Sequence, residues 1–435
     1  MPKRTATPAG TARRSMSAAA GATALGLLLA SCGGDGDSGA VEIDFYYPIA
    51  VGGPLESVID GYIEQFEDEN TGVEVTPVYS GDYEQTLASV QSATQAGNPP
   101  ALTVLGANNL VTLDDLELMT PIGEIVDDEE WLGSFEEGFM TDSTLDDGTV
   151  ASIPFQRSTV VMYWNKELFE EAGLDPEAPP ESWDDMVESG EQVMDGAGAQ
   201  WGVQIPSTTW GVWMLEAMVI QNGTMLWDPD SGTDVSYDDP ATVTALENWQ
   251  DLQEEGLEPS GTVDWGTLPD DFAGGGTGII WTTTGQLTNI RENADFDFGV
   301  APLPAQEQPG SPTGGGNLYV MNGVSDEEQE AAVELTRFLS SPEIQADWTV
   351  ESGYVAPLEE AWETEPLASY VEDFPEAMVA VEQLDDAEPE FGVYNRQEAF
   401  DVMGNSIEEV MGGADVESTL EEAQEQADDL LQEHR

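Results

Sequence analysis

The residue types that usually carry covalent chemistry are almost absent from this chain. His434 is the only histidine and lies at the C-terminus, and Cys32 is the only cysteine. Ser-His and Cys-His nucleophile pairs, thiol redox chemistry and histidine-ligated zinc are therefore excluded, and we expect no metal and no cofactor. Two carboxylates could still act as a glycosidase pair, although 87 acidic residues make chance proximity uninformative.

Aromatic and cationic side chains point instead to the binding of a polar small molecule. Trp210 and Trp213 follow a short loop at 206–209, and indole faces pack well against sugar C–H groups. Their three-residue spacing equally fits two tryptophans buried in the core at the start of a helix. Cations that could contact a phosphate are few: Arg157, Lys166, Arg291, Arg337, Arg396 and Arg435. We favour Arg157, with a surface ion pair as the alternative of equal weight.

The segment 154–186 must position several of these side chains. Residues 158–161 form a β-branched run, which favours an extended strand. Asn165 can cap a following helix, and Gly173 supplies the left-handed residue that ends it. Pro179-Pro180 then forces an extended approach to a second helix, for which Ser182 is the N-cap.

This order of strand, YWN, helix, AGLD, PP and SWDD closely resembles the hinge-crossing segment of extracellular solute-binding proteins that serve ABC importers. The resemblance implies an α/β, two-lobed periplasmic-binding-protein fold of type II, in which a sheet flanked by helices forms each lobe. It also implies a ligand cleft between the lobes and capture of a solute without turnover.

A second motif narrows the resemblance. The run YSGDYEQ at 79–85 is similar to the YxGxYEQ stretch of the glycerol-3-phosphate-binding branch, in which the second tyrosine, here Tyr83, contacts ligand. Gly106 stands where that branch carries an acid, which puts the glycerol hydroxyl contact in doubt. The resemblance, with Arg157 added as above, gives the following ligand-binding residues: Tyr47, Tyr83, Arg157, Ser158, Trp210, Trp213, Thr284, Gly285, Gly315, Tyr354 and Arg396.

Hydrophobic periodicity agrees with an α/β architecture. Strands are expected at Val41–Tyr47, Val73–Tyr79 and 101–105, with an amphipathic helix over 55–66 and another over 83–96. Strands that alternate with helices favour parallel pairing.

The chain is long enough for two lobes. We expect one lobe to contain 41–153 and 304–352, and the other 154–303 and 353–435. The crossovers are then expected near 154–160, 300–304 and 353–357.

The N-terminus is typical of an exported lipoprotein. Basic residues precede an apolar run that is shorter than a membrane span, and Leu29-Ala30-Ser31-Cys32 resembles a bacterial lipobox. We therefore expect a signal peptide at 1–31, lipid attachment at Cys32 and a flexible tether at 32–40. This would anchor the protein on the outer face of the cell membrane. A signal peptide with an incidental cysteine is the alternative, and Arg13-Arg14 leaves twin-arginine export open.

Charge is the most unusual feature of the composition. Four of the ten basic residues precede residue 32 and all 87 acidic residues follow it. Self-repulsion on this scale opposes compaction unless salt screens it, so we expect a halophilic or salt-tolerant source. Nucleic acid is excluded as a partner, because no basic patch could neutralise its phosphates.

The combined hypothesis is a monomeric substrate-binding lipoprotein of an ABC importer. It would capture glycerol-3-phosphate or a glycerophosphodiester and deliver it to the membrane permease. The first alternative is a binding protein for an uncharged mono- or oligosaccharide. The alternative of another class is a secreted carboxylate-pair glycosidase.

Overall fold

The structure is a computed structural model that describes residues 40–52, 54–229 and 231–434. The predicted signal peptide, Cys32, most of the predicted tether and Arg435 lie outside the described residues. The described residues form one compact unit.

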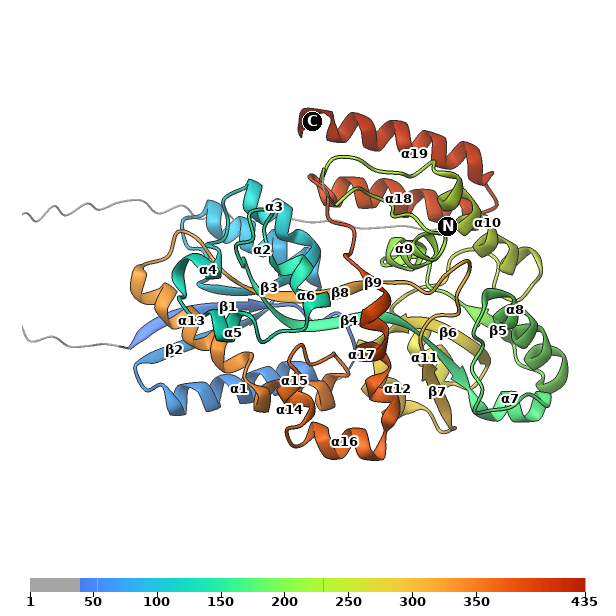
Figure 1. Ribbon diagram of the computed structural model, residues 1–435, viewed down its shortest axis with the longest axis horizontal. Coiled ribbons are helices and arrows are strands. Elements are labelled where there is room, and N and C mark those ends of the chain that lie inside the picture. Colours follow the sequence, from blue (N-terminus) through green and yellow to red (C-terminus); the bar gives the residue numbers. More distant parts are fainter. Residues whose placement is uncertain (1–39, 53, 230, 435) are drawn as a thin grey trace, which may run out of the picture. The chain divides into compact units, whose positions relative to one another are not determined.

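A nine-stranded sheet runs through the described part of this unit (Figure 1). Its strand order is β2-β1-β3-β8-β4-β6-β5, with β7 paired to β4 and β9 paired to β8. The strands are β1 Val41–Tyr47, β2 Val73–Tyr79, β3 Leu102–Gly106, β4 Ile153–Asn165, β5 Trp201–Gln204, β6 Thr277–Thr283, β7 Phe298–Ala301, β8 Ser311–Val320 and β9 Ala387–Glu388.

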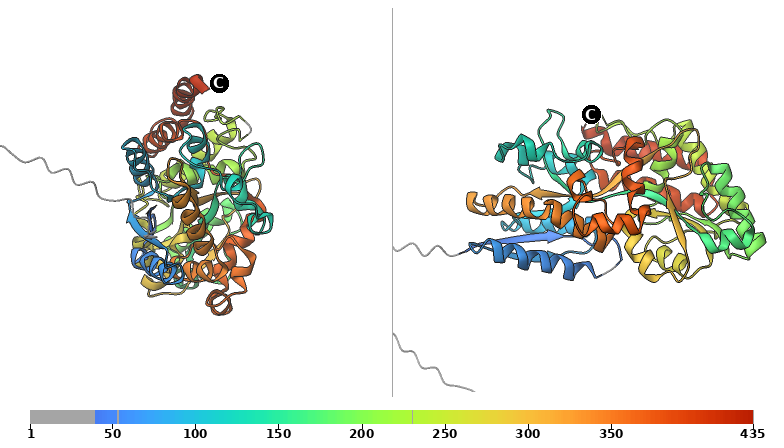
Figure 2. Two further views of the ribbon diagram at one scale, coloured as in Figure 1. Left: turned by 90° about the vertical axis from the view of Figure 1, so that its left-hand side faces the viewer. Right: turned by 60° about the horizontal axis from the view of Figure 1, so that its bottom comes forward.

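Helices pack around this sheet, as two further views show (Figure 2). Their bounds are α1 Leu55–Glu69, α2 Tyr83–Gln95, α3 Leu110–Asp115, α4 Ile122–Ile125, α5 Glu129–Leu132, α6 Glu137–Met140, α7 Lys166–Ala172, α8 Trp183–Gln192, α9 Gly211–Gln221, α10 Pro240–Glu254, α11 Leu268–Ala273, α12 Leu287–Asn293, α13 Asp326–Leu339, α14 Pro342–Ser352, α15 Glu359–Trp362, α16 Leu367–Asp373, α17 Val379–Gln383, α18 Arg396–Met411 and α19 Val416–Leu431. None of the described helices combines the length and apolarity needed to cross a membrane.

The alternating strands and helices at the start of the chain pair as their pattern predicts. β1 lies parallel to both β2 and β3, with Val41 opposite Val73. The predicted bounds of β1 and β2 are confirmed, and β3 begins and ends one residue later than expected. Asp82 begins α2 by accepting a hydrogen bond from the Gln85 amide at 2.8 Å, because an N-terminal turn leaves such amides without a helical partner.

Strand β4 joins the two ends of the sheet. Its first half pairs with β8, and its second half pairs with β6 and β7. The helix that follows begins and ends where predicted: Asn165 accepts a hydrogen bond from the Leu168 amide at 3.0 Å, and Gly173 has a left-handed φ of 84°. Ser182 likewise caps α8 by accepting from the Asp185 amide at 3.1 Å.

Two large apolar cores lie on either side of this junction. The first core is built on β1–β3 with α1, α13 and α14, and the second on α9, α10, α18 and α19 with β4 and β6. Residues from Tyr354 to Leu367 pack in the first core, and the chain joins the second core from Phe391 onward. Between these two stretches, Ala377 and Val379 pack with residues of β4, β6 and β7 in a smaller core.

Candidate ligand-binding cavity

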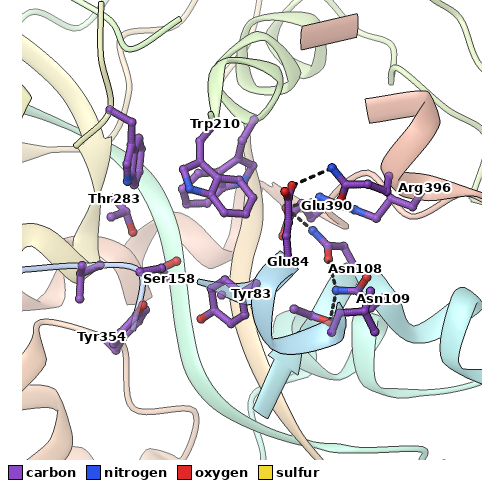
Figure 3. Close-up of a pocket in the computed structure, with 18 residues that line it drawn as sticks. Tyr83, Glu84, Asn108, Asn109, Ser158, Trp210, Thr283, Tyr354, Glu390 and Arg396 are labelled. Atoms are coloured by element: carbon purple, nitrogen blue, oxygen red, sulfur yellow. Dashed lines mark hydrogen bonds and ion pairs between the residues drawn. The ribbon is translucent and has the colours of Figure 1, made fainter. Parts of the chain in front are cut away.

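A cavity opens where elements of the two cores meet (Figure 3). Its empty volume is about 580 Å³, including the part open to solvent. Trp210 packs against both cores. Seven of the predicted ligand-binding residues line the cavity: Tyr83, Ser158, Trp210, Trp213, Gly315, Tyr354 and Arg396.

An aromatic cluster forms one wall of the cavity. Trp210 precedes α9 and lies edge-on to Tyr83 and Trp265, with ring centroids 6.4 Å apart in each pair. Trp213, one turn into α9, is 6.3 Å from Trp265. Its indole Nε1 donates to the Thr313 carbonyl at 2.9 Å, which fixes the ring orientation. Such a wall offers apolar faces to a ligand without needing to move.

Two tyrosines lie at another side of the cavity. Tyr83 begins α2 and Tyr354 follows α14, and the Tyr83 hydroxyl donates to Gln156 Oε1 at 3.3 Å. Burial raises the pKa of Tyr354 to about 12 and raises the pKa of Tyr83 well above its ordinary value. Both phenols therefore stay neutral and can donate hydrogen bonds to a ligand.

Glycines of β8 let the backbones approach closely beside the cavity. Gly315 has a φ of +92°, and a Cβ there would lie 1.8 Å from the Gln156 carbonyl oxygen. A Cβ on Gly314 would lie 2.3 Å from the Trp213 ring. Any side chain at either position would displace the strand or the indole, so glycine is required at both.

A charged cluster forms the wall nearest α18. Arg396 begins α18, and its Nη2 lies 3.5 Å from Glu390 Oε1 while its Nε donates to the Phe391 carbonyl at 3.0 Å. Glu390 also accepts a hydrogen bond from Asn108 Nδ2, and Asn109 in turn donates to Asn108 at 3.2 Å. Figure 3 shows these contacts as one chain of polar side chains. Arg396 is the one cation among the described residues that line the cavity.

Opposing effects within this cluster set the pKa of Glu390. Burial raises the pKa of Glu390 to about 7, and nearby Asp142 adds to the rise. Arg396, Arg157 and the Asn108 hydrogen bond act in the opposite direction. Glu390 therefore exchanges its proton in the range where the protein is expected to work.

A polar contact closes the rim between the two cores. Gln397 Nε2 on α18 donates to Glu84 Oε1 on α2 at 2.9 Å and to Asp401 at 3.0 Å. Both Glu84 and Gln397 line the cavity. A hydrogen bond between side chains of α18 and α2 therefore joins the two sides of the rim.

Arg157, the favoured phosphate contact, lies elsewhere. Its side chain is fully buried beneath the cavity, where Nη2 pairs with Asp142 at 3.2 Å and Nη1 donates to Asn317 at 3.0 Å. The guanidinium also stacks over the Phe139 ring at 4.9 Å. Successive residues of a strand point to opposite faces, so Ser158 reaches the cavity and Arg157 does not. Arg157 therefore forms an ion pair with an acid, but the pair is buried in the interior, whereas the alternative in the sequence analysis was a surface ion pair.

Three other predicted residues also lie off the cavity wall. Tyr47 is buried and stacks on Phe45 with ring centroids 5.6 Å apart. Thr284 accepts from the Thr159 amide at 3.4 Å, and its neighbour Thr283 lines the cavity in its place. Gly285 packs behind the wall, where a Cβ would lie 3.2 Å from the Tyr354 ring.

Several lining residues were not predicted from the sequence. The most prominent are Asn108, Trp265, Thr283 and Glu390. Asn108 follows directly after β3, and the end of a parallel strand is a common ligand position that could have pointed to it. Nothing in the local sequence separates Glu390 from the other acids.

The chemistry available at this cavity is that of binding. Its described lining offers aromatic faces, neutral phenols, amides and one paired guanidinium. Within the described residues no cluster of three or more His, Cys, Asp or Glu could hold a metal. An α/β sheet that spans two cores, with such a cavity at their junction, defines a protein that captures a small solute.

The chain belongs to the bacterial extracellular solute-binding protein family, which residues 61–376 match. It is thus an extracellular or periplasmic solute-binding component of an ABC importer, and not an enzyme, which sets the glycosidase alternative aside. The predicted α/β periplasmic-binding-protein fold is confirmed.

Individual relatives agree with this assignment. The sn-glycerol-3-phosphate-binding periplasmic protein UgpB of Pectobacterium atrosepticum is 30% identical over 367 residues, which cover 80% of each chain. UgpB from Mycobacterium tuberculosis, solved in complex with glycerophosphocholine, superposes with a TM-score of 0.79 at 23% identity over 91% of this chain and 99% of that chain. A cyclic alpha-maltosyl-1,6-maltose binding protein from Arthrobacter globiformis gives 0.75 at 24% identity over 91% and 100%.

Proposed function

We propose that this protein captures glycerol-3-phosphate or a glycerophosphodiester and delivers it to the permease of an ABC importer. The observation that carries the proposal is Arg396, a buried guanidinium on the wall of an aromatic cavity. A guanidinium suits a phosphate group because its planar N–H donors match the phosphate oxygens. The names of the UgpB relatives support the same ligand class.

In this proposal Trp210, Trp213 and Trp265 cover the carbon skeleton of the ligand. Tyr83, Tyr354 and Ser158 would donate hydrogen bonds to its hydroxyl groups. Arg396 replaces Arg157 as the phosphate contact. Gly106 offers no acid for the glycerol hydroxyls, and we assign their contact to Asn108, which also lines the cavity.

An uncharged mono- or oligosaccharide is the second candidate. It is favoured by the ion pair between Glu390 and Arg396, which already compensates the one cation among the described lining residues. Three tryptophans are also a suitable surface for sugar rings.

We further propose that the two cores act as lobes that close around the ligand. Closure would be driven by the higher affinity of the closed form, and the closed lobes would present a surface to the permease. The protein would act as a monomer tethered outside the membrane by a lipid on Cys32. Incorporation of labelled fatty acid into the wild type but not into Cys32→Ala would support the anchor, and equal labelling would refute it.

Calorimetric titration in high salt tests the ligand class. Glycerol-3-phosphate, glycerophosphocholine, maltose and trehalose would be titrated into the protein under one set of conditions. Saturable binding of a phosphate ligand without binding of either sugar would support the proposal. Binding of maltose or trehalose alone would favour the second candidate.

A further inference from the structure

The cavity carries more acid than base. Among the described lining residues, Glu84 and Glu390 are acidic and Arg396 alone is cationic. Glu390 and Arg396 are only 3% and 4% exposed, whereas Glu84 lies at the exposed rim. Salt and water screen a rim charge effectively but screen a buried one poorly. Glu390 is therefore the acid whose charge a bound ligand experiences most strongly.

Glu390 already pairs with the Arg396 guanidinium, which a phosphate ligand would need. Its Oε1 lies 3.5 Å from Arg396 Nη2, while Arg396 Nε is engaged by the Phe391 carbonyl. Asn108 fixes the carboxylate from the opposite core through its Nδ2. A phosphate that reaches Arg396 must therefore share the guanidinium with a carboxylate that cannot easily move away.

We infer that Glu390 sets the charge selectivity of the cavity, so that a singly charged phosphodiester binds in preference to a doubly charged phosphate monoester. This inference rests on the proposed function and chooses between its two ligands. The Arg396–Glu390 pair is electrically neutral as a whole, so it does not offset a second negative charge on the ligand. The monoester carries one more negative charge than the diester, and the Glu390 carboxylate repels that extra charge.

Other ionisable groups around Glu390 do not reverse this balance. Arg157 and Asp142 form a closed ion pair beneath the cavity, and their charges cancel. Glu216 on α9 is buried, and burial raises its pKa well above the ordinary value, which favours its neutral form. The groups that face Glu390 are Asn108, Asp142, Arg157, Arg396, Glu216 and Tyr83.

The experiment compares glycerol-3-phosphate with its methyl ester, which differ by one charge and one methyl group. Calorimetry at pH 8 in fixed high salt keeps the monoester doubly charged, because its second pKa is about 6. The proteins are the wild type, Glu390→Gln, and Glu388→Gln as a matched control. Glu388 is an exposed acid two residues away that does not line the cavity. Thermal unfolding of each protein verifies that it is folded.

We expect the wild type to bind the methyl ester about tenfold or more tightly than the monoester. Glu390→Gln should reduce this ratio by about tenfold through tighter monoester binding, and Glu388→Gln should leave it unchanged. Equal binding of both ligands by the wild type, or an unchanged ratio in Glu390→Gln, would overturn the inference.

A second measurement needs no variant. At pH 8 the free monoester is a dianion, so proton uptake seen by titrating the wild type in buffers of different ionisation enthalpy reports a proton bound by Glu390 or by the bound phosphate, and either one relieves their repulsion. Uptake with the monoester but not with the methyl ester supports the inference, and no uptake with either contradicts it. Failure of both phosphate ligands alongside binding of maltose would instead refute the proposed function.

Discussion

Replacing Arg157 with methionine separates a structural role from a ligand-binding role. In the structure the guanidinium pairs with Asp142, which is only 8% exposed, and donates to Asn317. Asp142 also accepts from Thr313 Oγ1 at 2.7 Å, but that hydroxyl carries no charge to replace the lost cation. Removing one partner of a buried pair costs about 3–5 kcal/mol, because the other charge stays buried and uncompensated. That is a large part of the 5–15 kcal/mol by which a typical domain is stable.

Urea unfolding at fixed high salt is the appropriate assay, since guanidinium chloride would itself screen the acidic surface. We expect Arg157→Met to lose about 3–5 kcal/mol of unfolding free energy, and Arg157→Met/Asp142→Asn to lose less than the sum of the single changes. Ligand affinity of the folded variant should change little. A stability loss below about 1 kcal/mol together with lost phosphate binding would refute this reasoning.

The remaining predictions concern the cavity wall, a buried carboxyl and the surface charge. Trp210→Ala should weaken phosphate and sugar ligands alike by about tenfold, measured by calorimetry, because it removes an aromatic face and no charge; an effect on one class alone would contradict this. Burial raises the pKa of Glu258 from 4.5 to about 8, so its contribution to stability falls as pH rises from 4.5 to 8, by at most about 5 kcal/mol. The urea midpoint of Glu258→Gln should therefore rise relative to that of the wild type between pH 4.5 and pH 8. Midpoints of the two proteins that change with pH in parallel would contradict this. With a formal net charge of -77, the urea midpoint of the wild type should rise between low and 1 M salt, and a salt-independent midpoint would refute the halophilic hypothesis.

Regular elements could be predicted from the sequence because their causes are local. The β-branched run of β4, the Asn165 cap and Gly173 each act within a few residues, and all three lie where expected. Tyr83 and Tyr354, which the family resemblance gave as ligand contacts, also line the same cavity.

The misplacement of Arg157 in the predicted site arises from the two-residue period of strands. Arg157 and Ser158 are neighbours on β4, and only Ser158 lines the cavity. Thr283 ends β6 and lines the cavity, whereas Thr284 begins the 3₁₀ turn that follows and does not line it. A shift of one residue moves a side chain to the other face of the sheet, and β4 is buried on both faces, so burial pattern alone could not fix the choice.

Glu390 could not be identified from the sequence for a different reason. Its role depends on Asn108, which lies 282 residues earlier in the chain, and on the arrival of Arg396 beside it. Contacts at such separation leave no local pattern. Among 87 acids, Glu390 is distinguished by being both buried and on the cavity wall, and both properties arise only in the folded chain.

The most direct test of phosphate capture at Arg396 is a calorimetric titration of glycerophosphocholine into the wild type and into Arg396→Gln in high salt. The account predicts saturable binding to the wild type and a loss of affinity of about 100-fold in a variant that still unfolds cooperatively. Unchanged affinity in Arg396→Gln, or binding of maltose but not glycerophosphocholine by the wild type, would contradict it.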